Sequence, residues 1–407
     1  MTLGDSFRMA TAAAFNVEAA TQAYLATVSG AARLRSDAYF EGGYWITLWG
    51  ALISVAVAYL FLRLGWAARL SAWSKRVTGG RLFLATLLFL LGFTILTALI
   101  ELPWSIYTEF AREHQYAMSN QSFGEWLGET AKSAAIGIPL TALVIALLFI
   151  GVRRAPRTWW AYGAAGTALF MAFGIAVAPV LIEPLFNKYT PMAASPLQAE
   201  ILKMARANGV PASNVLVVDA SRQTKRISAN VAGLGSTTRV ALNDNLLATN
   251  DPAGVMAVMG HELGHYVLNH IVTLIIGFTI LITLGFLVVQ AAVPALIRRN
   301  PGWGITDVGE PGAFAIWSIV FTLFFLLMTP VFNSITRFDE SQADIFGLNA
   351  ARAPDGFART ALRLSAYRKL DPSAFEEAVF YDHPSGATRI RMAMQWKSEH
   401  LGEPGVR

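Results

Sequence analysis

Apolar segments of about 20 residues alternate with polar connections along most of this chain of 407 residues. An α-helix rises about 1.5 Å per residue, so about 20 apolar residues are enough to cross the hydrocarbon layer of a bilayer. Uninterrupted apolar segments of this length lie at about 43–65, 82–104, 134–152, 159–182, 271–297 and 313–332. The pattern predicts a mainly α, polytopic membrane protein with about six transmembrane helices.

The region between the fourth and fifth spans carries shorter patterns. Lys188–Pro191 is typical of a loop, and helical periodicity follows over 197–208. Alternating apolar residues then predict a small β-sheet with a hairpin, formed by 214–219, 226–232 and 238–242 with a turn at Gly233–Ser236. The sequence therefore predicts a small soluble α+β insert.

Two further helices flank the last two spans. Asp251-Pro252 is typical of a helix start, and we expect this helix to run on toward the fifth span. After Pro330 a polar helix is expected over Phe332–Ala351. The predicted organisation is an amino-terminal amphipathic region with a helix over 10–33 (1–42), four spans (43–182), the soluble insert (184–270), a transmembrane hairpin (271–332) and a helical carboxyl-terminal part (333–407).

Composition narrows the possible functions. Charged residues make up 14% of the chain, against about 25% in an ordinary soluble domain. The chain has no cysteine, which excludes disulfides and thiolate metal ligands. The net charge of +5 comes partly from basic pairs beside the spans, where they face lipid headgroups. We find no basic soluble face, so the composition does not support nucleic-acid binding.

The motif His261-Glu262-Leu263-Gly264-His265 carries the candidate chemistry. Residues four apart share one face of a helix, so both imidazoles can bind one Zn²⁺. Glu262 follows the first histidine and can reach a water on that metal and accept its proton. The competing interpretation, a solvated amphipathic turn that happens to carry two histidines, explains less of the chain.

The third metal ligand lies elsewhere in the sequence. A metzincin would carry a histidine where this chain has Ile271, and His270 lies about 140° round an ideal helix from His265, so we expect it to point elsewhere. Glu340 and Asp344 are four apart, on one helical face. Glu340 is the best candidate ligand, with Asp344 accepting the spare N–H of a ligand histidine. Asp339 is a weaker candidate for the same ligand position. The competing interpretation of Glu340 and Asp344 is that they lie on an ordinary solvated helix face and bind no metal.

The sequence resembles the type I CAAX prenyl endopeptidase family of membrane zinc metalloproteases, in its shorter, bacterial-type form. The resemblance covers nearly the whole chain. It is carried by Ala38–Trp45, Ser228-Ala-Asn230, Arg239–Leu246, Val258–Tyr266 with Leu268-Asn-His270, Arg337–Asp344, and Asp382-His-Pro384 with Arg389.

This resemblance implies a ring of tilted membrane helices around a water-filled chamber, with one zinc ion per chain at one end. It implies that His261, His265 and Glu340 bind the metal and that Glu262 is the general base. It further implies a substrate-binding role for Asn230, which would pair with substrate backbone on an edge strand, and for Arg389, which would brace that region. His383 would donate to the developing oxyanion.

These expectations favour an integral membrane zinc metalloendopeptidase. A membrane-protein quality-control metalloprotease of the same clan is one alternative, and a non-enzymatic metal-binding transporter or scaffold is another. An intramembrane metalloprotease is disfavoured because Asn300-Pro-Gly302 lacks the acid that such an enzyme needs. A transporter is disfavoured because Glu101 and Glu183 lie at span ends rather than at midspan.

We expect a peptide or protein substrate, membrane-associated or lipidated, and a multi-pass protein of a bacterial inner membrane. The sequence does not define an oligomeric state, and a monomer is the simplest expectation. Basic residues cluster after the first, third and fifth spans, so the positive-inside rule places the zinc site on the non-cytoplasmic side. The family resemblance implies a cytoplasmic site, and we give it slightly more weight.

Overall fold

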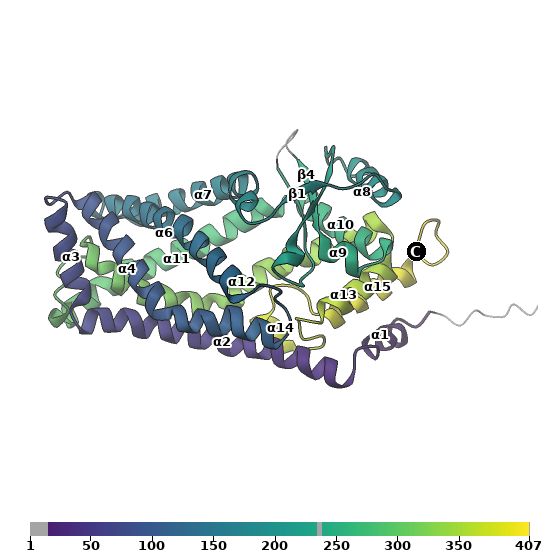
Figure 1. The fold of residues 1–407 in the computed structure, drawn as a ribbon, viewed down its shortest axis with the longest axis horizontal. Helices are drawn as coiled ribbons and strands as arrows, with labels where there is room; N and C mark the ends of the chain where they lie inside the picture. Colours follow the sequence, from purple (N-terminus) through teal and green to yellow (C-terminus); the bar gives the residue numbers. More distant parts are fainter. Residues whose placement is uncertain (1–14, 234–237, 407) are drawn as a thin grey trace, which may run out of the picture.

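The computed structural model describes residues 15–233 and 238–406, and its helices form an elongated bundle with a small sheet near one end (Figure 1). The amino-terminal half contains α1 (Val17–Leu25), α2 (Gly30–Arg63), α3 (Trp66–Val77), α4 (Leu82–Ser105), α5 (Arg112–Gln115), α6 (Phe123–Arg154) and α7 (Trp159–Val177). The second half contains β1 (Tyr189–Pro191), α8 (Pro196–Ala207), β2 (Val215–Val218), β3 (Ala229–Ala232), β4 (Arg239–Asn243), α9 (Asp244–Thr249), α10 (Pro252–Val267), α11 (His270–Arg299), α12 (Phe314–Ala351), α13 (Pro354–Leu364), α14 (Ala374–Phe380) and α15 (Gly386–Glu399).

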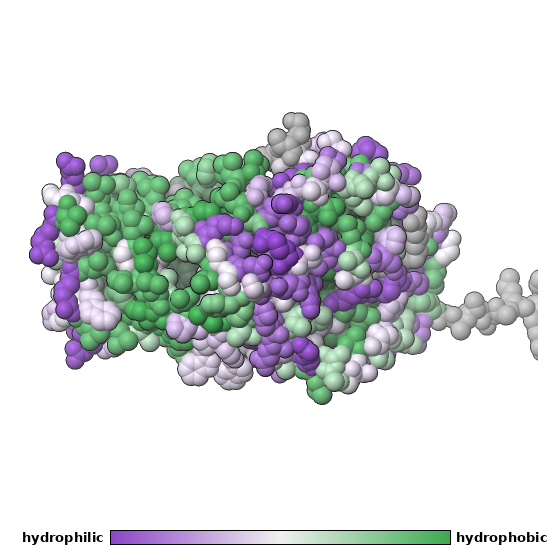
Figure 2. Space-filling model, viewed as in Figure 1, coloured by the Kyte–Doolittle hydropathy of each residue, from purple (hydrophilic) through white to green (hydrophobic). Residues whose placement is uncertain are grey.

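Six of the described helices are long and apolar enough to cross a membrane, which confirms the predicted number. They are α2, α4, α6, α7, α11 and α12, and the second, fourth and sixth spans are extended by short adjoining helical turns. Hydrophobic residues cover the surface of this bundle, whereas hydrophilic residues gather over the sheet end and at the far tip near α3 (Figure 2). The water-filled chamber that the resemblance implies stays a prediction.

Several of these helices, among them α2, α6 and α12, extend beyond their apolar segments. α2 begins at Gly30 rather than near residue 43, and α12 continues without a break from the sixth span through Ala351. The sequence predicted a separate polar helix after Pro330, but Pro330 lies inside α12. Hydrophobic segments mark only the part of a helix inside the bilayer, which explains both differences. The predicted helix over 10–33 falls partly outside the described residues, and within them α1 packs against α15.

The sheet has the order β1-β2-β4-β3. β3 and β4 pair antiparallel, which confirms the predicted hairpin, although most of its turn (234–237) lies outside the described residues. β2 pairs parallel with β4, and β1 pairs antiparallel with β2. The prediction of a loop at Lys188–Pro191 was therefore wrong for Tyr189–Pro191, because a three-residue edge strand ending in proline has too short a pattern to recognise.

Separate hydrophobic cores hold the two ends. One joins membrane helices through large side chains that are fully buried, among them Phe61, Phe89, Phe149 and Trp317. The other lies between the sheet, α8 and α10, and includes Ile201, Val215, Leu242, Met259 and Leu263. Because Met259 and Leu263 lie on the core face of α10, the opposite face of that helix carries His261 and His265, and Glu262 lies at its side.

Candidate metal centre

Helices α10 and α12, far apart in the sequence, cross closely at the candidate site. A Cβ added at Gly260 would lie 2.9 Å from the carbonyl oxygen of Gly347, and a Cβ added at Gly347 would lie 2.7 Å from the backbone nitrogen of His261. Only glycine at both positions permits this approach. α10 begins as predicted, with the Asp251 carboxylate accepting from the Gly254 N–H at 2.7 Å.

The crossing brings together three potential ligand side chains. His261 Nε2 and His265 Nε2 are 3.1 Å apart, and each lies 3.3 Å from an oxygen of Glu340. Ligand atoms about 2.0–2.1 Å from a tetrahedral zinc are about 3.3–3.4 Å from one another, close to these separations. The three residues form the one group of metal-binding type found among the described residues.

The electrostatics of the group favour a cation between these side chains. Burial alone would lower the pKa of His261, but hydrogen bonds with Asp344 and Glu340 outweigh it and raise that pKa to about 10. A proton is thus held where carboxylates converge on an imidazole. Two imidazoles and one carboxylate are also a donor set found in catalytic zinc sites, so the residues present fit a metal.

Buried charges orient His261 and Glu340. His261 Nδ1 lies 2.8 Å from Asp344 Oδ1, and Arg389 donates from Nε to Asp344 Oδ2 at 2.8 Å. Arg389 also donates to Glu340 Oε2 at 3.0 Å. Asp344, Glu340 and Arg389 are at most 7% exposed. One arginine from α15 therefore fixes both α12 carboxylates.

His270 supports His265, contrary to the prediction that it points elsewhere. Their Nδ1 atoms lie 2.9 Å apart, and His270 Nε2 lies 3.2 Å from the Gln342 side-chain oxygen. α10 ends at Val267, and Asn269 adopts a left-handed conformation with φ of 56°. This break changes the direction of the His270 side chain, so the angle of about 140° between His265 and His270 on an ideal helix does not apply. Asparagine tolerates the left-handed conformation better than most residues. Asn269 was therefore the signal in the sequence for a helix break just before His270.

Other predicted residues border the group. His383 Nε2 lies 3.3 Å from Glu340 Oε2, and its Nδ1 lies 2.7 Å from Asp382 Oδ1. Asp339 is buried, but neither of its side-chain oxygens has a hydrogen-bond partner within the described chain, and it is not among the three clustered ligands.

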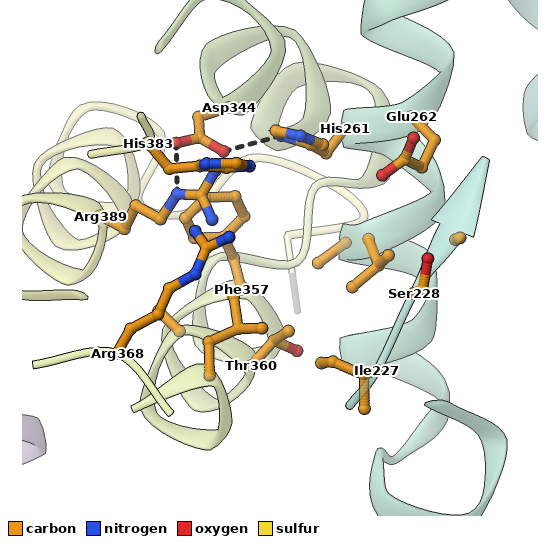
Figure 3. A pocket seen from close by; sticks show the side chains of 15 residues that line it. Ile227, Ser228, His261, Glu262, Asp344, Phe357, Thr360, Arg368, His383 and Arg389 are labelled. Carbon is orange, nitrogen blue, oxygen red and sulfur yellow. Dashed lines mark hydrogen bonds and ion pairs between the residues drawn. The ribbon is translucent and has the colours of Figure 1, made fainter. Parts of the chain in front are cut away.

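A pocket of about 270 Å³ opens beside this group (Figure 3). Glu262 and His261 line it, as do Ile227 and Ser228, which directly precede β3 (Figure 3). Burial raises the pKa of the Glu262 carboxyl above its usual value. Residues of α13, such as Phe357, form the apolar floor.

Strand β3 lies at the edge of the sheet and contacts α10. Asn230 sits in the middle of β3, paired with Ala241 of β4, as the predicted edge-strand position requires. Its buried Oδ1 atom has no hydrogen-bond partner among residues 15–233 and 238–406. An exposed strand edge can pair with an extended peptide through main-chain hydrogen bonds.

Six apolar spans and a histidine–carboxylate cluster on a His-Glu-x-x-His helix define an integral membrane metallopeptidase. Two family models match the chain: peptidase family M48 over residues 191–397, and the CAAX prenyl protease N-terminal region, with five membrane helices, over residues 19–188. The chain belongs to peptidase family M48.

Individual proteins agree with this assignment. An uncharacterized metalloprotease of Bacillus subtilis, YhfN, is 26% identical over 82% of this chain and 79% of its own length. CAAX prenyl protease 1 of Saccharomyces cerevisiae is 27% identical over 77% of this chain and 73% of its own. The crystal structure of S. mikatae Ste24p shares the fold, with a TM-score of 0.71 and 20% identity over 93% of this chain and 94% of that one.

Proposed function

We propose that this protein is a zinc metalloendopeptidase whose metal is held by His261, His265 and Glu340, one ion per chain. The observation that carries the proposal is the convergence of those three side chains, 3.1–3.3 Å apart, beside Glu262, which lines a pocket. Zinc suits two imidazoles and a carboxylate in a chain without cysteine. When bound, such an ion polarises the scissile carbonyl and lowers the pKa of water.

The chain's own residues handle the protons. Glu262 accepts a proton from the attacking water and returns it to the leaving amine. His383 donates from Nε2 toward the oxygen on which negative charge develops, and Asp382, 2.7 Å from its Nδ1, holds the ring in place. Asp344 accepts from the Nδ1–H of His261, which leaves Nε2 free to face the metal.

An extended substrate would bind along β3. This edge strand lies beside α10, and Asn230, whose buried side-chain oxygen has no partner within residues 15–233 and 238–406, would accept from substrate backbone once a peptide pairs with the strand. Arg389 would brace the site through Glu340 and Asp344, which occupy its Nε and one terminal nitrogen. Main-chain pairing gives affinity without dictating sequence, so side-chain selectivity comes from the pocket.

We further propose that substrates are membrane-associated or lipidated peptides and that the metal centre faces the cytoplasm of a bacterial inner membrane. The related CAAX prenyl proteases support the substrate class. The site lies at one end of the helix bundle and so faces one side of the membrane (Figure 1), and the family resemblance, weighed above the positive-inside rule, favours the cytoplasmic side. Single cysteines introduced near α3 and near α8 would be labelled from opposite sides of the membrane. Labelling of the α8 cysteine from outside intact cells would contradict the orientation.

Glu262→Gln tests the chemistry. The variant should keep its zinc, because Glu262 is not one of the clustered ligands, and should lose at least about 100-fold in peptidase activity on fluorogenic peptides. Metal content by mass spectrometry and cleavage rates in detergent provide the two readouts. Glu399→Gln, an exposed change at the end of α15, is the matched control. Full activity in a zinc-loaded Glu262→Gln protein would refute the proposed mechanism.

A further inference from the structure

Arg368 is a cation in the pocket beside the metal centre, and although Asp382 and Glu340 attract it, no described carboxylate lies within ion-pair distance of its guanidinium. It lines that pocket together with His261 and Glu262. Its guanidinium makes no hydrogen bond or ion pair of ordinary length with any part of the chain that the structure describes. The backbone around it is fixed, because its carbonyl accepts from Ser36 Oγ at 3.2 Å and the next carbonyl accepts from Tyr381 at 2.9 Å.

The neighbouring charges are already engaged. Arg389, also in the pocket, is paired with Glu340 and Asp344, and the nearby Asp382 is hydrogen-bonded to His383. Burial, followed by the positive charge of Arg389, lowers the pKa of Arg368. A partly buried, unpaired guanidinium is costly, and a carboxylate matches its donor geometry better than any neutral group does.

Strand direction indicates which part of a substrate would reach this arginine. Ile227 and Ser228 precede β3 and line the pocket, and the strand then runs from the pocket toward Glu262 (Figure 3). A peptide that pairs antiparallel with β3, the slightly more stable arrangement, runs in the opposite direction. It passes Glu262 first and enters the pocket with its carboxyl-terminal side, where Arg368 lies on the opposite wall (Figure 3).

We propose that Arg368 binds a carboxylate of the substrate on the carboxyl-terminal side of the scissile bond. The carboxylate is either the free end of the chain or an acidic side chain. This inference rests on the proposed peptidase function and adds a specificity-determining residue to it, Arg368, which would select peptides by an anion after the cleaved bond.

A fluorogenic library of random peptides, made with a free carboxylate or an amide end and with or without acidic residues, tests the proposal. The native protein should prefer one carboxylate-bearing form by about 10- to 100-fold in kcat/KM, the range expected for a hydrogen bond to a charged group. Dependence on the end group identifies the chain terminus, and dependence on acidic residues identifies a side chain.

Arg368→Gln should abolish this preference, whereas Arg368→Lys should keep part of it. Arg363→Gln removes the same charge from an exposed position outside the pocket and should keep the native preference. Zinc content and thermal melting would establish that all three variants are folded. An unchanged preference in Arg368→Gln, or a native protein that cleaves amide and carboxylate forms equally, would overturn the proposal.

Binding of the fluorescein-labelled library to Glu262→Gln protein, followed by fluorescence anisotropy, separates the two hypotheses. Carboxylate-dependent binding that disappears with Arg368→Gln supports the role of Arg368 in binding a carboxylate, even if no peptide is cleaved. If no peptide is cleaved by the native protein, the peptidase function fails. If cleavage depends on Glu262 but binding does not depend on the carboxylate, the proposed role of Arg368 is refuted and the peptidase function is supported.

Discussion

The two histidines of the proposed metal centre have the same chemistry but differ in what supports them. His261 faces the Asp344 carboxylate, which Arg389 fixes in turn. His265 faces a neutral imidazole, His270, which is held by the amide of Gln342. The side chain of His261 is 12% exposed and that of His265 is 27% exposed. His261 is therefore held by buried charge, whereas the more exposed His265 is held by a buried neutral imidazole that contacts an exposed amide.

This difference assigns separate tasks to the two sides. A carboxylate behind a ligand histidine fixes its tautomer and raises its basicity, and a neutral acceptor does so more weakly. The Asp344–Arg389 pair also positions Glu340, whereas the His270 side depends on the helix break at Asn269. Damage to the His261 side should therefore cost more metal affinity than damage to the His265 side.

Asp344→Ala should have the largest effect, because it removes the support of His261 and leaves Arg389 with only Glu340. We expect a loss of about 100-fold in zinc affinity and roughly 3 kcal/mol in the free energy of unfolding. Competition with a fluorescent chelator and thermal melting measure the two. Asp344→Asn, which keeps an acceptor but not the charge, should fall between alanine and the native protein. If Asp344→Ala bound zinc as tightly as the native protein, the support of His261 would not matter more than that of His265.

Gly347→Ala tests the helix crossing that both sides share. The added methyl would lie 2.7 Å from the backbone nitrogen of His261, so α10 and α12 must separate. Overpacking of this kind costs about 1–3 kcal/mol, and we expect weaker zinc binding with it. Gly174→Ala in α7, where an added Cβ meets nothing within 4 Å, is the control. If both alanine variants melt alike, the close crossing does not position the site.

His270→Ala should lower zinc affinity by about 10-fold, at the lower end of effects for partners behind ligand histidines. Cobalt substituted for zinc gives a second readout, since its visible spectrum reports the orientation of His265 and would not respond to a general loss of stability. His270→Asn supplies an acceptor and should restore part of both signals. If His270→Ala lost more zinc affinity than Asp344→Ala, the support of His265 would matter more than that of His261, contrary to our expectation.

Gln342→Ala should have the smallest effect, below about 3-fold in zinc affinity, because this amide is exposed and water can replace it. The same chelator competition detects it. A loss as large as that of His270→Ala would mean that the two residues act as one unit, which the double variant would reveal as a non-additive effect.

Local patterns were enough to predict much of this arrangement. The spacing of His261 and His265 and of Glu340 and Asp344 indicates shared helix faces, and Asp251-Pro252 indicates where α10 begins. The support of His265 was missed because a left-handed Asn269 ends the helix just before His270. The parallel pairing of β2 with β4 and the place of Arg368 in the pocket depend on contacts between distant segments, which no local period encodes.

The uninterrupted course of α12 ties the chemistry to the thickness of the membrane. From Phe314 to Glu340 the helix spans about 39 Å at 1.5 Å per residue, and it joins its apolar segment to Glu340 without an intervening loop. A tilt of about 1° imposed by a thicker or thinner bilayer would move the far end by about 0.7 Å, comparable with the tolerance of a catalytic constellation. The thickness of the bilayer, and hence its lipid composition, therefore affects the position of Glu340.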